Sequence, residues 1–205
     1  LRSLQKYSLP ETELLIHVDG SIDGTMEWIE KEGFDYVFED HQGIYHGFNE
    51  AISRASGEYI ALFADDMVVS PNWDKNLLKH AGKYRLLASR LVEPKRGSFP
   101  PIADFGKICS TFNEEEFIAY AKRISVDKVI PWETVGANFF SQELFWEMGG
   151  FDENYSPYGY GDADLLFRIK AKYADTEFLQ CLDSIFITSK QYQNPNLTKV
   201  RDGNL

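Results

Sequence analysis

Residues 57–73 read GEYIALFADDMVVSPNW, and the fold class follows from this stretch. Residues 59–63 form a continuous apolar run, which is typical of a strand buried on both faces within a parallel sheet. The run ends at two adjacent carboxylates, Asp65 and Asp66, and Ser70 with Pro71 then marks the start of a helix. Open α/β sheets bind ligands beyond the carboxyl ends of their strands, so these acids stand where a ligand is expected. Two carboxylates suit Mg²⁺ or Mn²⁺ bridging to a phosphate-bearing substrate, and the alternative is a solvated turn after the strand.

The stretches on either side alternate between strand and helix patterns. Before it, an apolar strand at 14–18 runs into the turn-rich segment 19–25, a helix at 26–31 and a strand at 35–38. Residues 43–55 then have apolar side chains at helical spacing, namely Ile44, Phe48, Ala51, Ile52 and Ala55. After it, we expect helices at 71–84, 113–123 and 163–173, a short helix capped by Ser141, and strands at 86–91, 134–140 and 178–188. This order predicts an α/β fold.

Size and composition indicate one folded domain, residues 1–190, followed by a polar tail at 191–205. The chain has 205 residues, of which 43% are hydrophobic and 15% aromatic, enough for a sizeable core. The net charge of −11 argues against nucleic acid or an anionic membrane as the main partner. No apolar run is long enough for a membrane span, so we expect a cytoplasmic protein, with peripheral attachment to the inner face of the membrane left open. Cys109 and Cys181 fit buried free thiols in a reducing compartment better than a disulfide.

Three stretches together resemble one protein family. They are HVDGSIDGT at 17–25, GFNEAISRASGEYIALFADD at 47–66 and GGFDENYSPYGYGDADLLFR at 149–168. Their order and spacing are similar to those of the family 2 glycosyltransferases, inverting enzymes of GT-A fold that use nucleotide-sugars. The resemblance implies a Rossmann-like three-layer α/β/α fold with a mostly parallel central sheet. It also implies Mn²⁺ or Mg²⁺ as the cofactor.

The chain departs from this family pattern in several places. The first apolar strand and its nucleobase-binding turn are lacking, and the loss of a central strand would leave its neighbours without hydrogen-bond partners. We expect such a strand upstream of Leu1. Val18, Ala64 and Gly161 stand where the family usually has an acid, and no histidine occurs near the last strand to complete a metal site. Each departure weakens the metal site or the catalytic base without removing it.

The resemblance assigns donor-site roles to four residues. Asp66 takes the position of the metal ligand, and Asp65 that of a contact with the ribose or sugar of the donor. Asp19 is the candidate for the nucleobase or ribose, because a carboxylate accepts hydrogen bonds from base N–H and sugar hydroxyl groups. The alternative for Asp19 is that it fixes its own turn. Asn49 is a further nucleotide-sugar candidate.

The acceptor side is assigned to the segment around residue 160. Asp162 takes the position of the general base, with a plain helix N-cap as the alternative role. Tyr158 and Tyr160 are candidates for stacking on an acceptor sugar, and the alternative is a lid that packs on its own core. Asp164 is expected to cap its helix or to pair with Arg168.

The reaction implied is transfer of a sugar, with inversion, from a nucleotide-sugar donor to a hydroxyl of a glycan or lipid-linked acceptor, as in polysaccharide biosynthesis. A UDP-sugar is the favoured donor. The alternative from another class is a catalytically impaired module that binds a sugar or nucleotide-sugar or serves in assembly. A third alternative, nucleotidyl transfer, requires a glycine-rich basic loop early in the chain, and the sequence has none.

Overall fold

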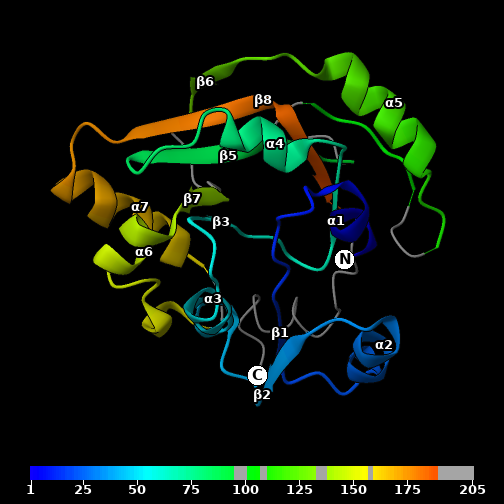
Figure 1. Ribbon diagram of the computed structural model, residues 1–205, viewed down its shortest axis with the longest axis horizontal. Helices are drawn as coiled ribbons and strands as arrows, with labels where there is room; N and C mark the ends of the chain where they lie inside the picture. Colours follow the sequence, from blue (N-terminus) through cyan, green and yellow to red (C-terminus); the bar gives the residue numbers. More distant parts are fainter. Residues whose placement is uncertain (95–100, 107–109, 133–137, 157–158, 189–205) are drawn as a thin grey trace, which may run out of the picture.

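The computed structural model of the chain describes residues 1–94, 101–106, 110–132, 138–156 and 159–188 (Figure 1). Helices and strands alternate along the chain, as the sequence pattern predicts. In chain order the described elements are α1 (Arg2–Tyr7), β1 (Ile16–Asp19), α2 (Thr25–Glu32), β2 (Tyr36–Glu39), α3 (Ile44–Ser53), β3 (Tyr59–Ala61), β4 (Met67–Val69), α4 (Trp73–Leu78), β5 (Arg85–Val92), α5 (Glu114–Ile124), β6 (Val129–Pro131), β7 (Phe139–Ser141), α6 (Gln142–Glu147), the 3₁₀ helix η1 (Glu153–Tyr155), α7 (Gly161–Lys172) and β8 (Glu177–Thr188).

The strands form two sheets. A six-stranded sheet has the order β3-β7-β5-β8-β4, and β6 pairs with the same outer edge of β8 as β4, further toward its start. The long pairing of β5 with β8 is parallel, whereas the short strands β3, β4, β6 and β7 pair antiparallel. A separate two-stranded sheet contains β1 and β2, which are also parallel. Parallel pairing therefore accounts for the two most extended ladders of a mixed α/β fold.

The apolar run at 59–63 has core clusters on both faces, but its strand β3 lies at the edge of the sheet and pairs antiparallel with β7. The prediction of a strand within a parallel sheet is wrong on this point, because an apolar run reports burial and not the direction of the neighbouring strand. Ile60 belongs to a core cluster with side chains of α3, α6 and α7, whereas Tyr59, Ala61 and Phe63 pack against the cluster under α1 and α4. In β5, Leu86 and Leu87 divide between the same two clusters because successive side chains point to opposite faces. The sheet is thus the middle of three layers, and α5 covers a third cluster near the end of β8.

In the described residues, β1 and β2 form a sheet of their own, separate from the six-stranded sheet. Within the described residues, no strand joins the β1–β2 pair to the six-stranded sheet. Helix α3 packs on β1 and leads through Gly57 into β3, so it connects the two parts (Figure 1).

Several expected elements have different limits in the structure. Helix 71–84 contracts to α4, and the strands β4 and β6 were not predicted because three-residue strands have too little pattern to recognise. Asn113 caps α5 by accepting a hydrogen bond from the N–H of Glu116 (3.1 Å), as expected. Part of the expected strand 134–140 and the tail 191–205 lie outside the described residues.

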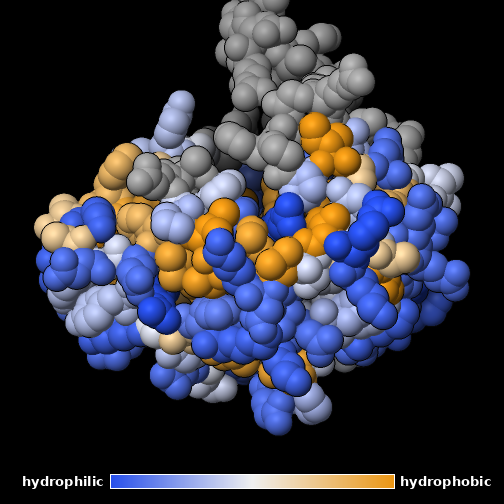
Figure 2. All heavy atoms as spheres, turned by 90° about the horizontal axis from the view of Figure 1, so that it is seen from above, coloured by the Kyte–Doolittle hydropathy of each residue, from blue (hydrophilic) through white to orange (hydrophobic). Residues whose placement is uncertain are grey.

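Figure 2 shows the face that is uppermost in Figure 1, where apolar side chains gather near the centre within a hydrophilic rim. Among the described helices, none combines the length and the apolar character needed to cross a membrane.

Candidate functional site

Asp65 and Asp66 occupy a tight turn between β3 and β4. The N–H of Met67 donates to the carbonyl of Ala64 (3.3 Å), so the two acids are the central residues of the turn. Met67 then pairs with Thr188 at the end of β8. The acids therefore lie at the carboxyl end of β3, beside the end of the central strand β8.

The charges of the two acids lie side by side, and this adjacency acts on the pKa of Asp66. Asp65 is exposed and Asp66 half-buried, and burial together with the charge of Asp65 raises the pKa of Asp66. A hydrogen bond from its own backbone N–H lowers the pKa of Asp66 by less than burial and Asp65 raise it. A half-buried carboxylate whose ionised form is disfavoured gains stability from a divalent cation, so the residues present fit a hard metal ion.

Asp19 has partners for both of its carboxylate oxygens. Its Oδ1 accepts hydrogen bonds from the backbone N–H groups of Gln42 (2.7 Å) and Gly43 (3.3 Å), and its Oδ2 lies 2.7 Å from Nδ1 of His41. Burial raises the pKa of Asp19, but the hydrogen bonds and the nearby His41 lower it on balance. The acid therefore fixes the loop before α3 rather than its own turn, and the carboxylate stays ionised.

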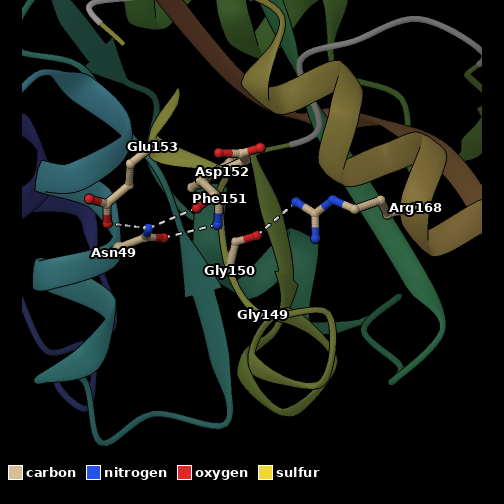
Figure 3. A pocket seen from close by; sticks show the side chains of 7 residues that line it. All are labelled: Asn49, Gly149, Gly150, Phe151, Asp152, Glu153 and Arg168. Atoms are coloured by element: carbon tan, nitrogen blue, oxygen red, sulfur yellow. Dashed lines mark hydrogen bonds between the residues drawn. The ribbon is translucent and has the colours of Figure 1, made fainter. Parts of the chain in front are cut away.

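Asn49 and Arg168 hold the segment 149–153 from opposite sides (Figure 3). The side chain of Asn49 donates to the carbonyl of Phe151 (2.9 Å) and accepts from its N–H (3.0 Å). Arg168 donates to the carbonyls of Met148 (2.6 Å) and Gly150 (2.8 Å), and pairs with Asp164 at 2.7 Å, which confirms the pairing expected from the sequence.

These contacts surround an open pocket of about 460 Å³. Its lining residues are Asn49, Gly149, Gly150, Phe151, Asp152, Glu153 and Arg168. Asn49 is the one sequence-predicted site residue in this lining, so the pocket does not unite the candidate acids.

Asp162 lies in the first turn of α7, half-buried, and is not the N-cap of that helix. The N-cap is Tyr160, whose backbone has φ 65°. The N–H of Gly161 donates to the hydroxyl of Tyr45 (2.9 Å), and a Cβ on Gly161 would lie 2.5 Å from a ring carbon of Tyr45. Tyr45 therefore occupies the space where the family pattern places a glutamate side chain.

Tyr160 is suited to an external contact. Its side chain is 79% exposed, and its left-handed backbone is an uncommon conformation for a bulky residue. Strain of this kind is concentrated at functional sites. Tyr158 lies outside the described residues.

The N-terminal end of α3 brings two of the candidate acids into one neighbourhood. Asp19 bonds the N–H of Gly43, the residue before the helix, and Tyr45 in the first turn bonds the start of α7, next to Asp162. The turn with Asp65 and Asp66 is not joined to this group by a hydrogen bond among the described residues.

A polar network beside this neighbourhood has no clear signal in the sequence. Oε2 of Glu39 lies 3.0 Å from Nε2 of His17 and 2.9 Å from Nε2 of His46, and Nδ1 of His46 lies 2.9 Å from Glu153. His46 thus bridges β2 and the segment held by Asn49. Helical spacing places His46 and Asn49 on adjacent turns, but the carboxylates that they bond are distant in sequence.

Comparison with known proteins identifies the family and the fold of the chain. The family description "Glycosyl transferase family 2" matches residues 1–149. The crystal structure of S. aureus TarS 1–349 superposes with a TM-score of 0.59 at 17% identity, over 92% of this chain and 55% of that one. Its complex with UDP gives a TM-score of 0.57 at 16% identity, over 91% and 54% of the two chains.

A third solved structure, GalNAc-T7 with UDP, GalNAc and Mn²⁺, gives a TM-score of 0.64 at 15% identity, over 93% of this chain and 40% of that one. The chain therefore spans about half or less of these structures, and at such identities the likeness shows the GT-A fold. No curated protein matches the chain.

Proposed function

Since the chain belongs to glycosyl transferase family 2, we propose that it transfers a sugar from a nucleotide-sugar to a hydroxyl of a glycan or lipid-linked acceptor. A UDP-sugar is the favoured donor, and the transfer inverts the configuration at the anomeric carbon. The observation that carries the proposal is the turn after β3. Asp66 there is half-buried, its pKa is raised, and the adjacent Asp65 adds a second negative charge. A donor diphosphate bound through a divalent cation relieves this unfavourable arrangement of charge.

In the proposed mechanism Asp66 would hold Mn²⁺ or Mg²⁺, and the charge of the ion would stabilise the departing nucleoside diphosphate. Asp65, Asp19 and Asn49 orient the nucleotide-sugar. Because Ala64 supplies no ligand, the protein gives few donors to the ion, and metal binding depends on the phosphates of the nucleotide.

Asp162 accepts the proton of the acceptor hydroxyl while that oxygen attacks the anomeric carbon from the face opposite the diphosphate. Attack from the opposite face inverts the configuration. The ordered start of α7, anchored by Tyr45, holds Asp162 in place, and the exposed Tyr160, together with Tyr158, gives the acceptor sugar a surface for stacking.

A catalytically impaired binding or assembly module is the second candidate function. The observation that favours it is the division of the sheet, together with the use of both Asp19 oxygens by the protein itself. A module of this kind binds a sugar or nucleotide without turning it over.

Thermal unfolding with UDP, GDP and dTDP, each with and without Mn²⁺, tests the donor site first. We expect a rise in Tm that needs both UDP and Mn²⁺ and that is lost in Asp66→Asn. Turnover of the UDP-sugar that gives the largest shift is then measured for Asp162→Asn, with a loss of at least about 100-fold expected for a missing general base.

Asp175→Asn is the matched control, since Asp175 is an exposed acid just beyond the far end of α7 and should leave turnover unchanged. Unaltered turnover in Asp162→Asn would remove the base assignment. Binding of UDP-sugar by the wild-type chain without turnover would favour the binding module, and neither binding nor turnover with Mn²⁺ would contradict donor use altogether.

A further inference from the structure

Strand β8 has an irregular stretch beside its parallel partner β5. The pairing register shifts between Ser89 and Arg90, which face Cys181 and Ile185, so residues 182–184 form a bulge. Bulges redirect side chains and are enriched near functional sites. Here the bulge directs the Asp183 carboxylate to the Cys181 thiol, with Sγ and Oδ1 2.9 Å apart.

A third donor comes from the chain just after α4. A ring nitrogen of His80, Sγ of Cys181 and a carboxylate oxygen of Asp183 all lie within 4.8 Å of one another. Donors around a tetrahedral zinc ion are about 3.3–3.6 Å apart, given Zn–N and Zn–O bonds of about 2.0–2.1 Å and a Zn–S bond of about 2.3 Å. Movements of about 1 Å are therefore enough to complete a three-ligand site.

In the described part of the chain, the histidine of this cluster has a ring nitrogen whose hydrogen-bonding capacity is unused. Nε2 of His80 is buried and has no hydrogen-bond partner among the described residues. A buried polar nitrogen without a partner is unfavourable in a native structure and calls for a specific explanation such as an ion. Cys181 is fully buried and Asp183 almost so, and buried ionisable groups of this kind usually pair or bind a metal.

A nucleophilic role for the cysteine does not fit the site. Burial and the neighbouring Asp183 raise the pKa of Cys181 to about 12, whereas reactive cysteines have lowered pKa values and accessible sulfurs. Lys79 contacts the outer oxygen of Asp183 at 3.1 Å, so it balances one negative charge and orients the carboxylate. Such a contact to a ligating carboxylate is a common supporting feature of metal sites.

The cluster is separate from the nucleotide site. Cys181 lies in the first half of β8, opposite Ser89 and Val129, whereas the end of β8 pairs with Met67, next to Asp66. The donor sets differ as well, since the turn at Asp65 and Asp66 offers hard carboxylate oxygens and the cluster offers sulfur, nitrogen and oxygen. A soft thiolate with imidazole favours Zn²⁺ over Mg²⁺ or Mn²⁺.

We propose that His80, Cys181 and Asp183 bind one divalent transition metal ion of the zinc type, which joins α4 to the bulge of β8. On binding, the S–H bond of Cys181 breaks, its proton passes to solvent, and Sγ bonds the ion, with no change of oxidation state. The ion replaces the thiol hydrogen between Sγ and Oδ1 and gives the His80 ring a partner. Its function is structural support of the sheet behind the nucleotide site.

Titration of the purified, metal-free chain with Co²⁺ tests the site directly, because a thiolate ligand gives a sulfur-to-cobalt charge-transfer band that oxygen ligands do not give. We expect the band to saturate at one Co²⁺ per chain and to disappear when Zn²⁺ is added. Zn²⁺ at 100 times its Kd should raise Tm by about 5–10 °C.

Cys181→Ser should abolish the band, and Cys109→Ser, the matched control, should retain it. Should Cys181→Ser fail to fold, His80→Gln is decisive. It removes a partly exposed ligand and should weaken Co²⁺ binding at least about 10-fold while leaving the metal-free melting curve in place. No band in the wild-type chain, an unchanged band in Cys181→Ser, or unchanged affinity in His80→Gln would overturn the proposal.

Discussion

Asp19 and Asp66, two acids that follow strands, differ in what surrounds their charges. Asp19 receives hydrogen bonds from two backbone N–H groups and faces His41, so the fold stabilises its ionised form. Asp66 is half-buried beside Asp65, so the fold disfavours its ionised form. A carboxylate whose ionised form is disfavoured in the free protein is typical of a binding function, because contact with a ligand removes this cost in free energy.

This difference predicts that Asp66→Asn stabilises the free protein while it removes metal binding. A raised carboxyl pKa means that stability falls as pH rises from the ordinary value near 3.8 through the raised one, so the penalty develops as the carboxyl group ionises above pH 3.8. We expect Tm at pH 7 to rise by about 1–3 °C in the variant, and the gain to vanish below about pH 4. Calorimetry across this pH range, without metal, measures it. A lower Tm at pH 7 would show that Asp66 has a structural role instead.

Gly161 illustrates how one residue departs from a family pattern for a steric reason. The ring of Tyr45 fills the space in which a side chain at position 161 would start, and its hydroxyl accepts the N–H of Gly161. The sequence alone presents the glycine as a lost acid. The structure presents it as the small partner of an aromatic ring.

Gly161→Ala should therefore destabilise the chain by about 1–3 kcal/mol, because overpacking displaces the ring. The same substitution in a Tyr45→Leu background should cost much less, since the ring is gone. Urea denaturation of the four proteins in this double-mutant cycle gives the coupling between the two positions. Equal costs in both backgrounds would mean that the helix start, and not the ring, rejects the methyl group.

Among the elements, α3 shows most clearly what the sequence can and cannot predict. Its helical period, its position before β3 and its role in an α/β unit follow from the spacing of apolar residues. The buried face does not, because Ile44, expected on it, is 41% exposed, while the neighbouring Tyr45 is buried. Tyr45 is drawn inward by the backbone of α7, more than a hundred residues away, and no local pattern encodes that contact.

His46 on the same helix predicts a pH dependence. Its two ring nitrogens face Glu153 and Glu39, and a neutral imidazole can donate to one of them only. The hydrogen bond with Glu153 raises the pKa of His46 more than burial lowers it, and Glu39 adds to the rise. The pKa of Glu39 is lowered most by its hydrogen bond with His17 and next by that with His46. The pKa of Glu153 is lowered most by its hydrogen bond with Asn49 and next by that with His46.

The signs of these shifts set the pH window of the stabilisation. The histidine contribution is fully present below about pH 6.5 and is lost as pH rises through the raised value. The carboxylate contribution is present above about pH 4.5 and is lost as pH falls through the lowered values. His46→Gln should thus lose about 0.5–1 kcal/mol near pH 5.5 and less by pH 9. Urea unfolding at both pH values measures the difference, and Glu153→Gln should remove most of it. A pH-independent loss would assign His46 to packing.

At the scale of the whole molecule, the sequence predicts the layering of helices on the sheet better than it predicts which strands pair within the sheet. Long apolar runs such as residues 59–63 identify buried strands, and the family resemblance supplies the three-layer arrangement. The edge strands β4 and β6 are too short to leave a pattern. The proposed zinc-type cluster unites His80, just after α4, with two residues of β8, and only the folded chain brings them together. The positions of Asp19, Asp65 and Asp66 at or after the ends of strands are predictable because a strand followed by an acid is a local signal, whereas their roles stay predictions.

The divided sheet predicts uneven stability across the molecule. The β1–β2 pair lacks hydrogen bonds to the six-stranded sheet within the described residues, and a two-stranded unit is marginal by itself. Asn49 supplies one of the ties that hold α3, and with it β1, to the rest of the chain. Hydrogen exchange followed by mass spectrometry should therefore show earlier exchange in β1 and β2 than in β5 and β8.

Asn49→Ala should accelerate exchange in β1 and β2 about 10-fold, since a lost pair of hydrogen bonds is worth about 1–2 kcal/mol. Asn76→Ala, which removes one hydrogen bond from α4 to the carbonyl of Asp183 in the main sheet, should leave β1 and β2 unchanged. Equal protection of both sheets in the wild-type chain would show that the division does not weaken the fold.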